Sequence, residues 1–545
     1  MRYKINILVL GFVGLAFAAS AQDTTKKQRV EITSAFKPVL KNAVKINFNA
    51  TPPAPDETRP NLNYNIPIQN LYFNLQPVAL KPMALQIDSS GFAHNSNYVK
   101  AGYGNFNTPV AEAGFTIGDG KNTNFNLFAS HLSQKGDLRL QKFSNTSINA
   151  HLNTLTGKVE VYGKAGYQQQ TFYQYGLDTS TRNKSDDSLK KPYQTYTIRA
   201  GFRNAFVNRY GLTYNPDLNI NVFNDSRASE TNAALDVPVE IRVGNNFGAL
   251  IRANADLTTF TPTGASSSYT NNVFFINPAL ILKTSLLRLR AGIRPTWDNG
   301  TFHVLPDVLL DYPTKDGKAI IIAGWTAHVR KNTYQFLASQ NPWINQQPLS
   351  QFNTRITEAY AGVKGSLANS FNYRIQGGFT EFLNLPLFVN SQKPISLFTV
   401  RREGKLQAIH IQSELGFVLQ DKFNASAKLD VYNFINQKTE NSAWHVLPMQ
   451  LTAAMRWQPV KKIMVKGDLF TWQGAPYLIN NSGTEGRLPA VFDLNAGIEF
   501  HVTKNVAVWT QFNNILNNTY QRWNNYPQLG FQFLGGIRLT FDQNL

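Results

Sequence analysis

The chain has 545 residues and a formal net charge of +19, and it is rich in glycine, tyrosine and phenylalanine, with 36, 22 and 37 of them. It contains no cysteine, which excludes a disulfide framework, a thiolate metal site and a lipidated N-terminal cysteine. Beyond residue 21 there is no run of about 20 apolar residues, which excludes a membrane-spanning helix from the mature chain.

Residues 1–21 have the three parts of a secretory signal peptide. Arg2 and Lys4 give a positive start, an apolar run follows from Ile7 to Ala19, and small residues end the segment. We expect cleavage after Ala21 and export of the mature chain. Export argues against nucleic acid as a partner, which the basic composition alone would suggest.

Residues 22–96 differ in composition from the rest of the chain. They hold eight of the 26 prolines, and residues without an N–H disfavour helix interiors and central strands. We therefore expect an extended and mostly irregular segment. Near its start, Val30 to Ala35 could form a short strand that pairs with a periplasmic partner, and an ordinary mobile terminus is the alternative.

From residue 97 to residue 541, apolar and polar residues alternate in about twenty segments, as expected of strands with unlike faces. The last segment shows the pattern clearly, and only Leu534 breaks it. Its apolar set, on one parity, is Phe531, Phe533, Ile537, Leu539 and Phe541. A secreted string of β-sandwiches is one alternative. Repetition on this scale favours an all-β fold, a transmembrane antiparallel β-barrel that this strand closes.

The connections between the expected strands give a second indication of a barrel. Short connections alternate with longer ones, as periplasmic turns alternate with external loops in bacterial barrels. The spacing predicts about 22 strands, with about 20 or 24 as alternatives, and it places the N-terminal segment in the periplasm. Residues 224–236 and 383–402 are expected among the longer loops.

Aromatic residues near the expected strand ends suit two girdles at the membrane interfaces. Simple packing is the alternative for each one. The set is Tyr103, Phe172, Tyr173, Tyr193, Trp297, Trp325, Trp444, Trp457, Trp472, Trp509 and Tyr520.

Basic residues outnumber acidic ones on the parity that faces away from lipid. The predicted basic lining of the lumen is Arg199, Arg203, Arg252, Arg288, Arg290, Arg294, Arg374 and Arg456. Such a lining favours anionic solutes through its focused potential. Salt bridges to luminal acids, or contact with the N-terminal segment, are the alternatives. The basic composition also suits the lipid and lipopolysaccharide phosphates of an outer membrane.

Residues 331–354 form an expected external loop with an unusual composition. Tyr334, Phe336 and Trp343 occur there among several asparagines and glutamines. Rings and amides together can stack on sugars and bond to them, or they can contact a lid protein. A loop that merely tolerates exposed aromatic residues is the alternative.

The sequence offers little support for an enzyme. Its eight histidines form no H-E-x-x-H or comparable metal spacing, and no G-x-S-x-G or P-loop is present. We predict no catalytic residue, no metal ligand and no cofactor, although a Ser–His pair assembled across strands would leave no sequence signal.

The C-terminal hairpin has a distinctive motif. It consists of the stretch Asn513-Asn-Ile-Leu-Asn-Asn-Thr-Tyr520, then Tyr526-Pro527 and Gly530, then a last strand that ends in an aromatic residue. This order resembles the terminal hairpin of TonB-dependent receptors. The resemblance implies an outer-membrane barrel of 22 strands that takes up a solute, is inserted by the barrel-assembly machinery and contacts TonB or another envelope protein. Glu31, Ile32 and Thr33 resemble part of a TonB box.

The chain departs from the family pattern at both ends. Classical family members have a plug of well over a hundred residues, whereas residues 22–96 provide room only for an abridged plug or a lead-in. This segment resembles the N-terminal lead-in of a barrel-only branch of the family, which lacks a full plug domain. Residues 542–545 form a tail after Phe541, which displaces the terminal signal by four positions. Three functions remain open at this stage: solute uptake, a structural barrel that docks other envelope proteins, and a plugless porin that prefers anions.

Overall fold

The computed structural model describes residues 97–541, except for 119–121, 177–183, 207, 209, 316–317, 346–351, 368–369, 392–393, 420–421 and 480–482. The predicted signal peptide, the segment 22–96 with Glu31, Ile32 and Thr33, and the tail 542–545 lie outside the described residues. No helix among the described residues is long and apolar enough to cross a membrane.

The first strands in chain order are β1 (Asn97–Gly104), β2 (Thr108–Gly118), β3 (Thr123–Lys135), β4 (Lys142–Thr156), β5 (Val159–Tyr173), β6 (Lys190–Asn204), β7 (Leu212–Tyr214), β8 (Asp217–Asp225), β9 (Ala228–Val243) and β10 (Phe247–Pro262). There follow β11 (Tyr269–Lys283), β12 (Arg288–Asp298), β13 (Thr301–Pro313), β14 (Ala319–Arg330), β15 (Thr354–Leu367), β16 (Phe371–Asn390), β17 (Phe398–Leu419), β18 (Phe423–Gln437) and β19 (Met449–Val460). The last are β20 (Ile463–Trp472), β21 (Pro476–Ile479), β22 (Thr484–Arg487), β23 (Val491–His501), β24 (Val506–Asn513), β25 (Gln521–Trp523), β26 (Tyr526–Pro527) and β27 (Gln532–Phe541). The described helices are α2 (Tyr334–Gln340) and the 3-10 turn η2 (Asp187–Leu189).

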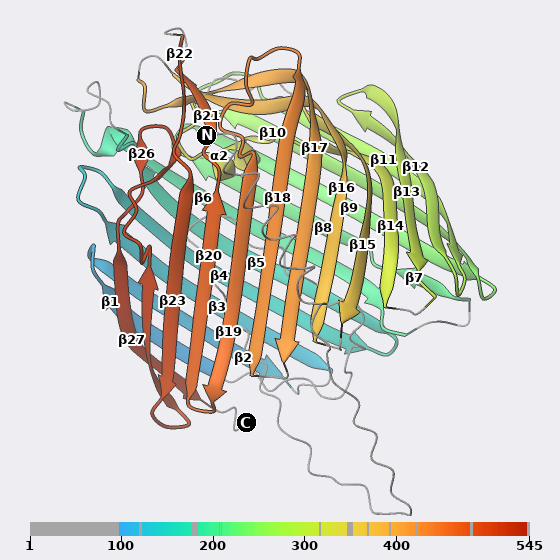
Figure 1. The fold of residues 1–545 in the computed structure, drawn as a ribbon, viewed down its shortest axis with the longest axis horizontal. Coiled ribbons are helices and arrows are strands. Elements are labelled where there is room, and N and C mark those ends of the chain that lie inside the picture. The colour runs from blue at the N-terminus through green and yellow to red at the C-terminus, as the bar shows by residue number, and fades with distance from the viewer. Residues whose placement is uncertain are drawn as a thin grey trace, which may run out of the picture. The chain divides into compact units, whose positions relative to one another are not determined.

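The sheet closes on itself, because the first strand pairs with the last. β1 and β27 run antiparallel from Asn97 opposite Phe541 to Gly104 opposite Leu534, and Figure 1 shows them side by side. β7 and β8 pair with successive parts of β9 and share one position in the wall, while β21 and β22 form a hairpin beyond it. The result is a closed antiparallel barrel of 22 strands, which confirms the predicted fold class.

The outer surface of the barrel is apolar. In β27, Phe533, Ile537, Leu539 and Phe541 are exposed, and the same parity carries exposed apolar residues on strand after strand. Closure pairs the edge N–H and C=O groups, as a lipid-facing structure requires. Leu534, which breaks the alternation, is buried on the luminal side against Val110, Leu132 and Trp509, so the exception reflects luminal packing.

The two ends of the barrel differ. One end has tight turns such as residues 157–158 and 461–462, whereas the other has most of the long connections, including 331–353 and 514–531. We call the former the short-turn end and the latter the long-loop end. Two of the loops expected there are largely strand. The turn between β8 and β9 has only residues 226–227, and β16 pairs with β17 as far as Asn390 opposite Phe398. Residues 385–390 are buried on both faces, so they show no alternation.

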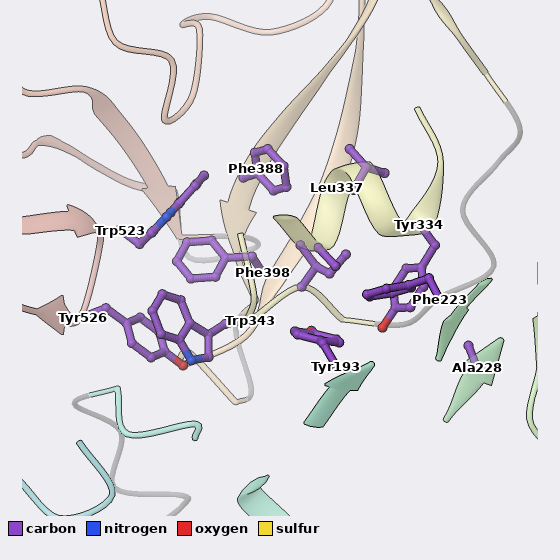
Figure 2. Packing of buried hydrophobic residues seen from close by; sticks show 12 residues of the cluster. Tyr193, Phe223, Ala228, Tyr334, Leu337, Trp343, Phe388, Phe398, Trp523 and Tyr526 are labelled. Atoms are coloured by element: carbon purple, nitrogen blue, oxygen red, sulfur yellow. The ribbon is translucent and has the colours of Figure 1, made fainter. Parts of the chain in front are cut away.

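The long-loop end has a hydrophobic core of its own. Residues 331–345, 385–391, 394–400, 438–448 and 520–530 pack together there with the ends of β6, β8 and β9, and we call these five segments the loop cap. The largest cluster consists of Tyr193, Phe223, Ala228, Tyr334, Leu337, Ala338, Trp343, Ile344, Phe388, Phe398, Trp523 and Tyr526. Figure 2 shows these rings and aliphatic side chains converging from α2, the ends of strands and the C-terminal hairpin. Because β6 and β16 lie far apart around the wall, the cluster bridges the mouth of the barrel.

Hydrogen bonds fix the rings of the cap in place. The rings of Trp343 and Tyr526 stack with their centroids 3.6 Å apart. Trp343 Nε1 donates to the carbonyl of Tyr173 over 2.9 Å, and the Tyr526 hydroxyl donates to the carbonyl of Ser396 over 2.6 Å. Each buried ring thus satisfies its polar atom, which a buried tryptophan or tyrosine needs.

Two buried carboxylates anchor the backbone of the cap. Glu230 accepts the N–H groups of Tyr334 and Gln335 at the start of α2, over 2.6 and 3.0 Å. Glu403 accepts N–H groups from residues 438–440, the shortest being 2.7 Å from Glu440. These acceptors satisfy backbone donors that would otherwise be buried without a partner.

Candidate functional site

A cavity of about 1240 Å³ occupies the lumen beneath part of the loop cap. Its walls are formed by strands from β1 to β6 and by β19, β20, β23, β24 and β27. Residues 338–343 and 520–529 of the cap contribute further lining residues. The cavity therefore lies on the luminal side of segments that are far apart in the sequence and meet only in the closed barrel.

The lining of the cavity is dominated by amides and aromatic rings. Amide side chains of the wall include Gln134, Asn145, Asn149, Gln168, Gln170 and Gln511. Aromatic side chains include Tyr98, Phe128, Tyr167, Trp472, Trp509 and Tyr520. Amides offer donors and acceptors at fixed positions, and rings offer flat apolar faces, so the lining suits a ligand with many hydroxyl groups.

Charges in the cavity are paired only in part, because four of the ten charged lining residues form ion pairs with one another. The basic side chains that line it are Lys100, Lys142, Lys164, Lys466, Arg522 and Arg538, and the acidic ones are Glu112, Asp468, Asp493 and Glu499. Arg538 bonds to Glu499 over 3.0 Å, and Lys100 lies 3.4 Å from Glu112. Basic groups remain in excess, so the cavity carries a positive balance.

One wall of the cavity shows how its rings are positioned. Trp509 projects from β24 into the lumen and packs over Gly102 of β1, where a Cβ atom would collide with the indole ring. The ammonium of Lys100 lies 4.3 Å from the centroid of the same ring. A glycine is required here because the ring and the neighbouring backbone approach so closely.

Three solved structures have the same barrel. The FrpB iron transporter from Neisseria meningitidis aligns with a TM-score of 0.62 at 10% identity, over 82% of this chain and 81% of that one. The siderophore receptor PirA from Acinetobacter baumannii aligns with a TM-score of 0.62 at 8% identity, over 82% of this chain and 80% of PirA. The ferric-catecholate import receptor Fiu from E. coli aligns with a TM-score of 0.62 at 11% identity, over 83% of this chain and 82% of Fiu.

The chain has the barrel fold of the TonB-dependent receptors. No protein-family model matches the sequence, and no curated protein does. The resemblance expected from the C-terminal hairpin is therefore confirmed at the level of the fold. A closed barrel with an apolar exterior is the architecture of a multi-pass outer-membrane protein, as predicted.

In this barrel, the eight arginines of the predicted luminal lining all lie on the inward parity of their strands. Four of them bond to acidic partners: Arg199 to Asp217, Arg203 to Glu160, Arg252 to Asp236 and Arg290 to Asp307, over 2.7–3.1 Å. None of the eight is among the residues that line the cavity. The charges of these four are thus compensated at the wall.

The other four arginines of that set have varied surroundings. Arg294 donates to the carbonyl of Ala327 over 3.2 Å and lies over the ring of Phe275. Arg374 donates to Gln376, and Arg456 faces Lys466 in the pairing of β19 with β20. Arg288 is exposed at the short-turn end.

The expected loop contacts Tyr334, Phe336 and Trp343 are placed differently from the prediction. Tyr334 and Trp343 are only 2% and 6% exposed, because they form part of the aromatic cluster of the cap. Phe336 packs beside the cluster, under the guanidinium of Arg330. The rings therefore hold the cap together and are not presented on the outer surface.

The expected aromatic girdles form only in part. Tyr103, Trp297, Trp325 and Trp457 are exposed on the outer face, as predicted. Tyr193, Trp444, Trp472, Trp509 and Tyr520 are buried in the cap or the lumen instead. The physical reason is where these rings lie in the barrel. They occupy inward-facing positions of strands or lie in the loops, where packing against other side chains determines their position.

Sequence reasoning missed Arg522 as a lining residue. It lies in β25, within the loop that joins β24 to β27, where no strand alternation indicates the direction of a side chain. The available signal was its place beside Trp523 in the hairpin motif. Within the described part of the chain, no group of three or more His, Asp or Glu side chains could hold a metal ion.

Proposed function

We propose that this barrel takes up a solute across the outer membrane, with the luminal cavity as its binding site and the loop cap as its cover. The observation that carries the proposal is the cavity of about 1240 Å³ lined jointly by the wall and the cap. A ligand that comes from the capped end can reach a site beneath packed loops only if the cap opens, as in a gated uptake protein.

The solved structures with this fold support uptake over the alternatives. The three neighbours are described as an iron transporter, a siderophore receptor and a ferric-catecholate import receptor. A permanently open porin does not need an aromatic core across its mouth, and the ion pairs of Arg199, Arg203, Arg252 and Arg290 reduce the field that would select anions. The neighbours are described as a transporter and as receptors, and we propose no catalysis.

Opening of the cap or release of the solute would use an energised partner. We propose TonB or another envelope protein for this role, on the basis of the shared fold. Lipid and lipopolysaccharide would surround the apolar exterior, and the barrel-assembly machinery would insert the chain.

Accumulation of labelled solutes by cells tests the proposal. Cells that produce the chain are compared with cells that lack it, with neutral oligosaccharides, acidic oligosaccharides and ferric chelates as the panel. We expect at least one solute to accumulate only in producing cells and to stop accumulating when a protonophore is added. No accumulation of any solute, together with co-purification of a stoichiometric envelope protein, would instead support the docking barrel.

A further inference from the structure

Arg522 stands apart from the other arginines of the lumen by its place. It belongs to β25, in the hairpin of the loop that joins β24 to β27, and it borders the cavity from the cap. The hairpin is held by its own bonds, since Asn525 N donates to Gln521 Oε1 over 2.7 Å and Gln528 N donates to the carbonyl of Tyr520 over 2.9 Å. The residue is therefore part of a built structure.

The ring next to Arg522 fixes the guanidinium. The centre of the guanidinium lies 4.5 Å from the centroid of the Trp523 ring. That ring is itself packed among Phe388, Phe398 and His445, with centroids 5.1–5.5 Å away. A cation on an immobile aromatic face loses little freedom when it binds a ligand, which favours recognition.

The charge of Arg522 has no acidic counterpart among the residues that the structure describes. No ion pair includes it there, and its Nη1 atom is buried without a hydrogen-bond partner. Burial lowers the pKa of Arg522 to about 10, so the group stays charged at neutral pH. Arg538, in the same cavity, is instead neutralised by Glu499 at 3.0 Å.

A charged group with a buried and unpaired nitrogen atom is costly, and such groups occur where a ligand completes them. The surroundings indicate what kind of ligand this is. A phosphate or sulfate ion alone would fill a small fraction of the cavity, whereas the amides and rings of the wall suit hydroxyl groups and sugar faces.

We propose that the cavity binds an oligosaccharide that carries an anionic group, a carboxylate or a sulfate ester, with Arg522 bonding to that group. The inference rests on the proposed function, because it names the substrate class of the same cavity. Arg522 sets the specificity for charge, and the amides of the wall, such as Gln168 and Gln511, hold the neutral hydroxyls.

Isothermal titration of the purified mature protein in detergent tests the proposal. The probes are trigalacturonate, maltotriose with one sulfate ester, and unmodified maltotriose. We expect an acidic probe to bind at least roughly tenfold more tightly than maltotriose, and Arg522→Gln to remove that preference, because a charged hydrogen bond contributes about that much. The acidic probe that binds more tightly distinguishes carboxylate from sulfate.

Two matched variants control the experiment. Arg522→Lys keeps the charge and should retain the preference for acidic probes, whereas Arg203→Gln, at a paired position outside the cavity, should bind like the wild type. Folding of the variants is judged by heat-modifiable mobility on gels. If Arg522→Gln does not fold, the proposal is tested by the preference of the wild-type protein for acidic over neutral probes. Equal binding of all three probes, or no binding, overturns the proposal. Solute accumulation in cells would still test uptake separately.

Discussion

The barrel wall and the loop cap follow different rules for what is buried. In the wall, side chains alternate between lipid and lumen, so Ile537 and Leu539 are exposed on the outside while Arg538 between them is buried. At the cap, Trp343 and Tyr526 meet Tyr193 of β6 from distant parts of the chain, and all three rings are buried. The comparison shows that the surrounding medium sets the sequence pattern. Lipid on the outer face of a strand imposes a period of two, whereas a hydrophobic core formed by loops in water imposes no period.

Truncating a ring of the cap should have the largest effect. Tyr526→Ala removes the partner of Trp343 and the bond to Ser396, and loss of a large buried ring costs about 3–5 kcal/mol. Hydrogen exchange should accelerate in residues 331–345 and 520–530 but not in the wall strands. Tyr210→Ala, at the short-turn end, is the control. Faster exchange in the wall would contradict the separation of the two regions.

A charge on the outer face should destabilise the wall by a slightly smaller amount. Ile251 is exposed on the outer face, so Ile251→Arg places a guanidinium in lipid. A charge there lowers the free energy of unfolding, by about 2–4 kcal/mol near the midplane of the membrane. Asn254→Arg, on the inward parity of the same strand, is the matched control and should cost much less. The free energy of unfolding in lipid vesicles, from urea titration, measures both. Equal losses would mean that the two faces do not meet different media.

The wall was predictable from the sequence because the alternation within each strand reflects lipid on one face and the lumen on the other. The apolar parity of Phe531, Phe533, Ile537, Leu539 and Phe541 needed no knowledge of the partner strand. The cap was not predictable in this way. Residues 385–390 are buried on both faces and were expected to form a loop. Tyr334 and Trp343 looked like surface contacts because the residues that bury them come from elsewhere in the sequence.

The candidate site was predictable in character but not in position. The basic excess of the lumen was visible in the parity pattern, yet it could not show that Asp217, Glu160, Asp236 and Asp307 would pair with four of the arginines. Arg522 lies outside any regular alternation, so its direction depends on the fold of a long loop. Pairing across strands and loop packing are long-range properties that one local pattern does not encode.

Acid should loosen the cap while leaving the wall intact. His445 is 2% exposed; its Nδ1 donates to the carbonyl of Phe388 over 2.8 Å, and its Nε2 accepts from Asn524 N over 3.4 Å, which requires the neutral ring. Burial lowers its pKa from 6.5 to about 3. The unfolded state therefore binds the proton first, so stability is complete above about pH 6.5 and falls below it, by about 2 kcal/mol at pH 5.

Hydrogen exchange of the cap at pH 7 and pH 5, corrected for intrinsic rates, measures this effect. His445→Asn serves as the comparison, because asparagine tolerates the positive φ of 56° at this position and does not titrate in this range. The variant should lack the added acid-dependent opening. The same increase in the variant would assign the effect to another group.

The smallest effect is expected where the wall carries an exposed ion pair. Arg203→Gln breaks the contact with Glu160 at 2.8 Å, but the arginine is 51% exposed to the lumen. Such pairs contribute about 0–1 kcal/mol. Urea titration should show a change within that range, and a loss comparable to that of Ile251→Arg would mean that the luminal pairs stabilise the wall as strongly as its lipid face does.

The most direct measurement of the central claim, that the cap covers the luminal cavity, uses the absence of cysteine from the chain. Ser130→Cys places one thiol in the cavity, Ser188→Cys places one on an exposed loop, and each is labelled with a bulky maleimide on intact cells. We predict slow labelling at position 130, at least roughly tenfold faster labelling when Tyr526→Ala is added, and fast labelling at position 188 throughout. Equally fast labelling at position 130 with and without Tyr526→Ala would contradict a closed cap.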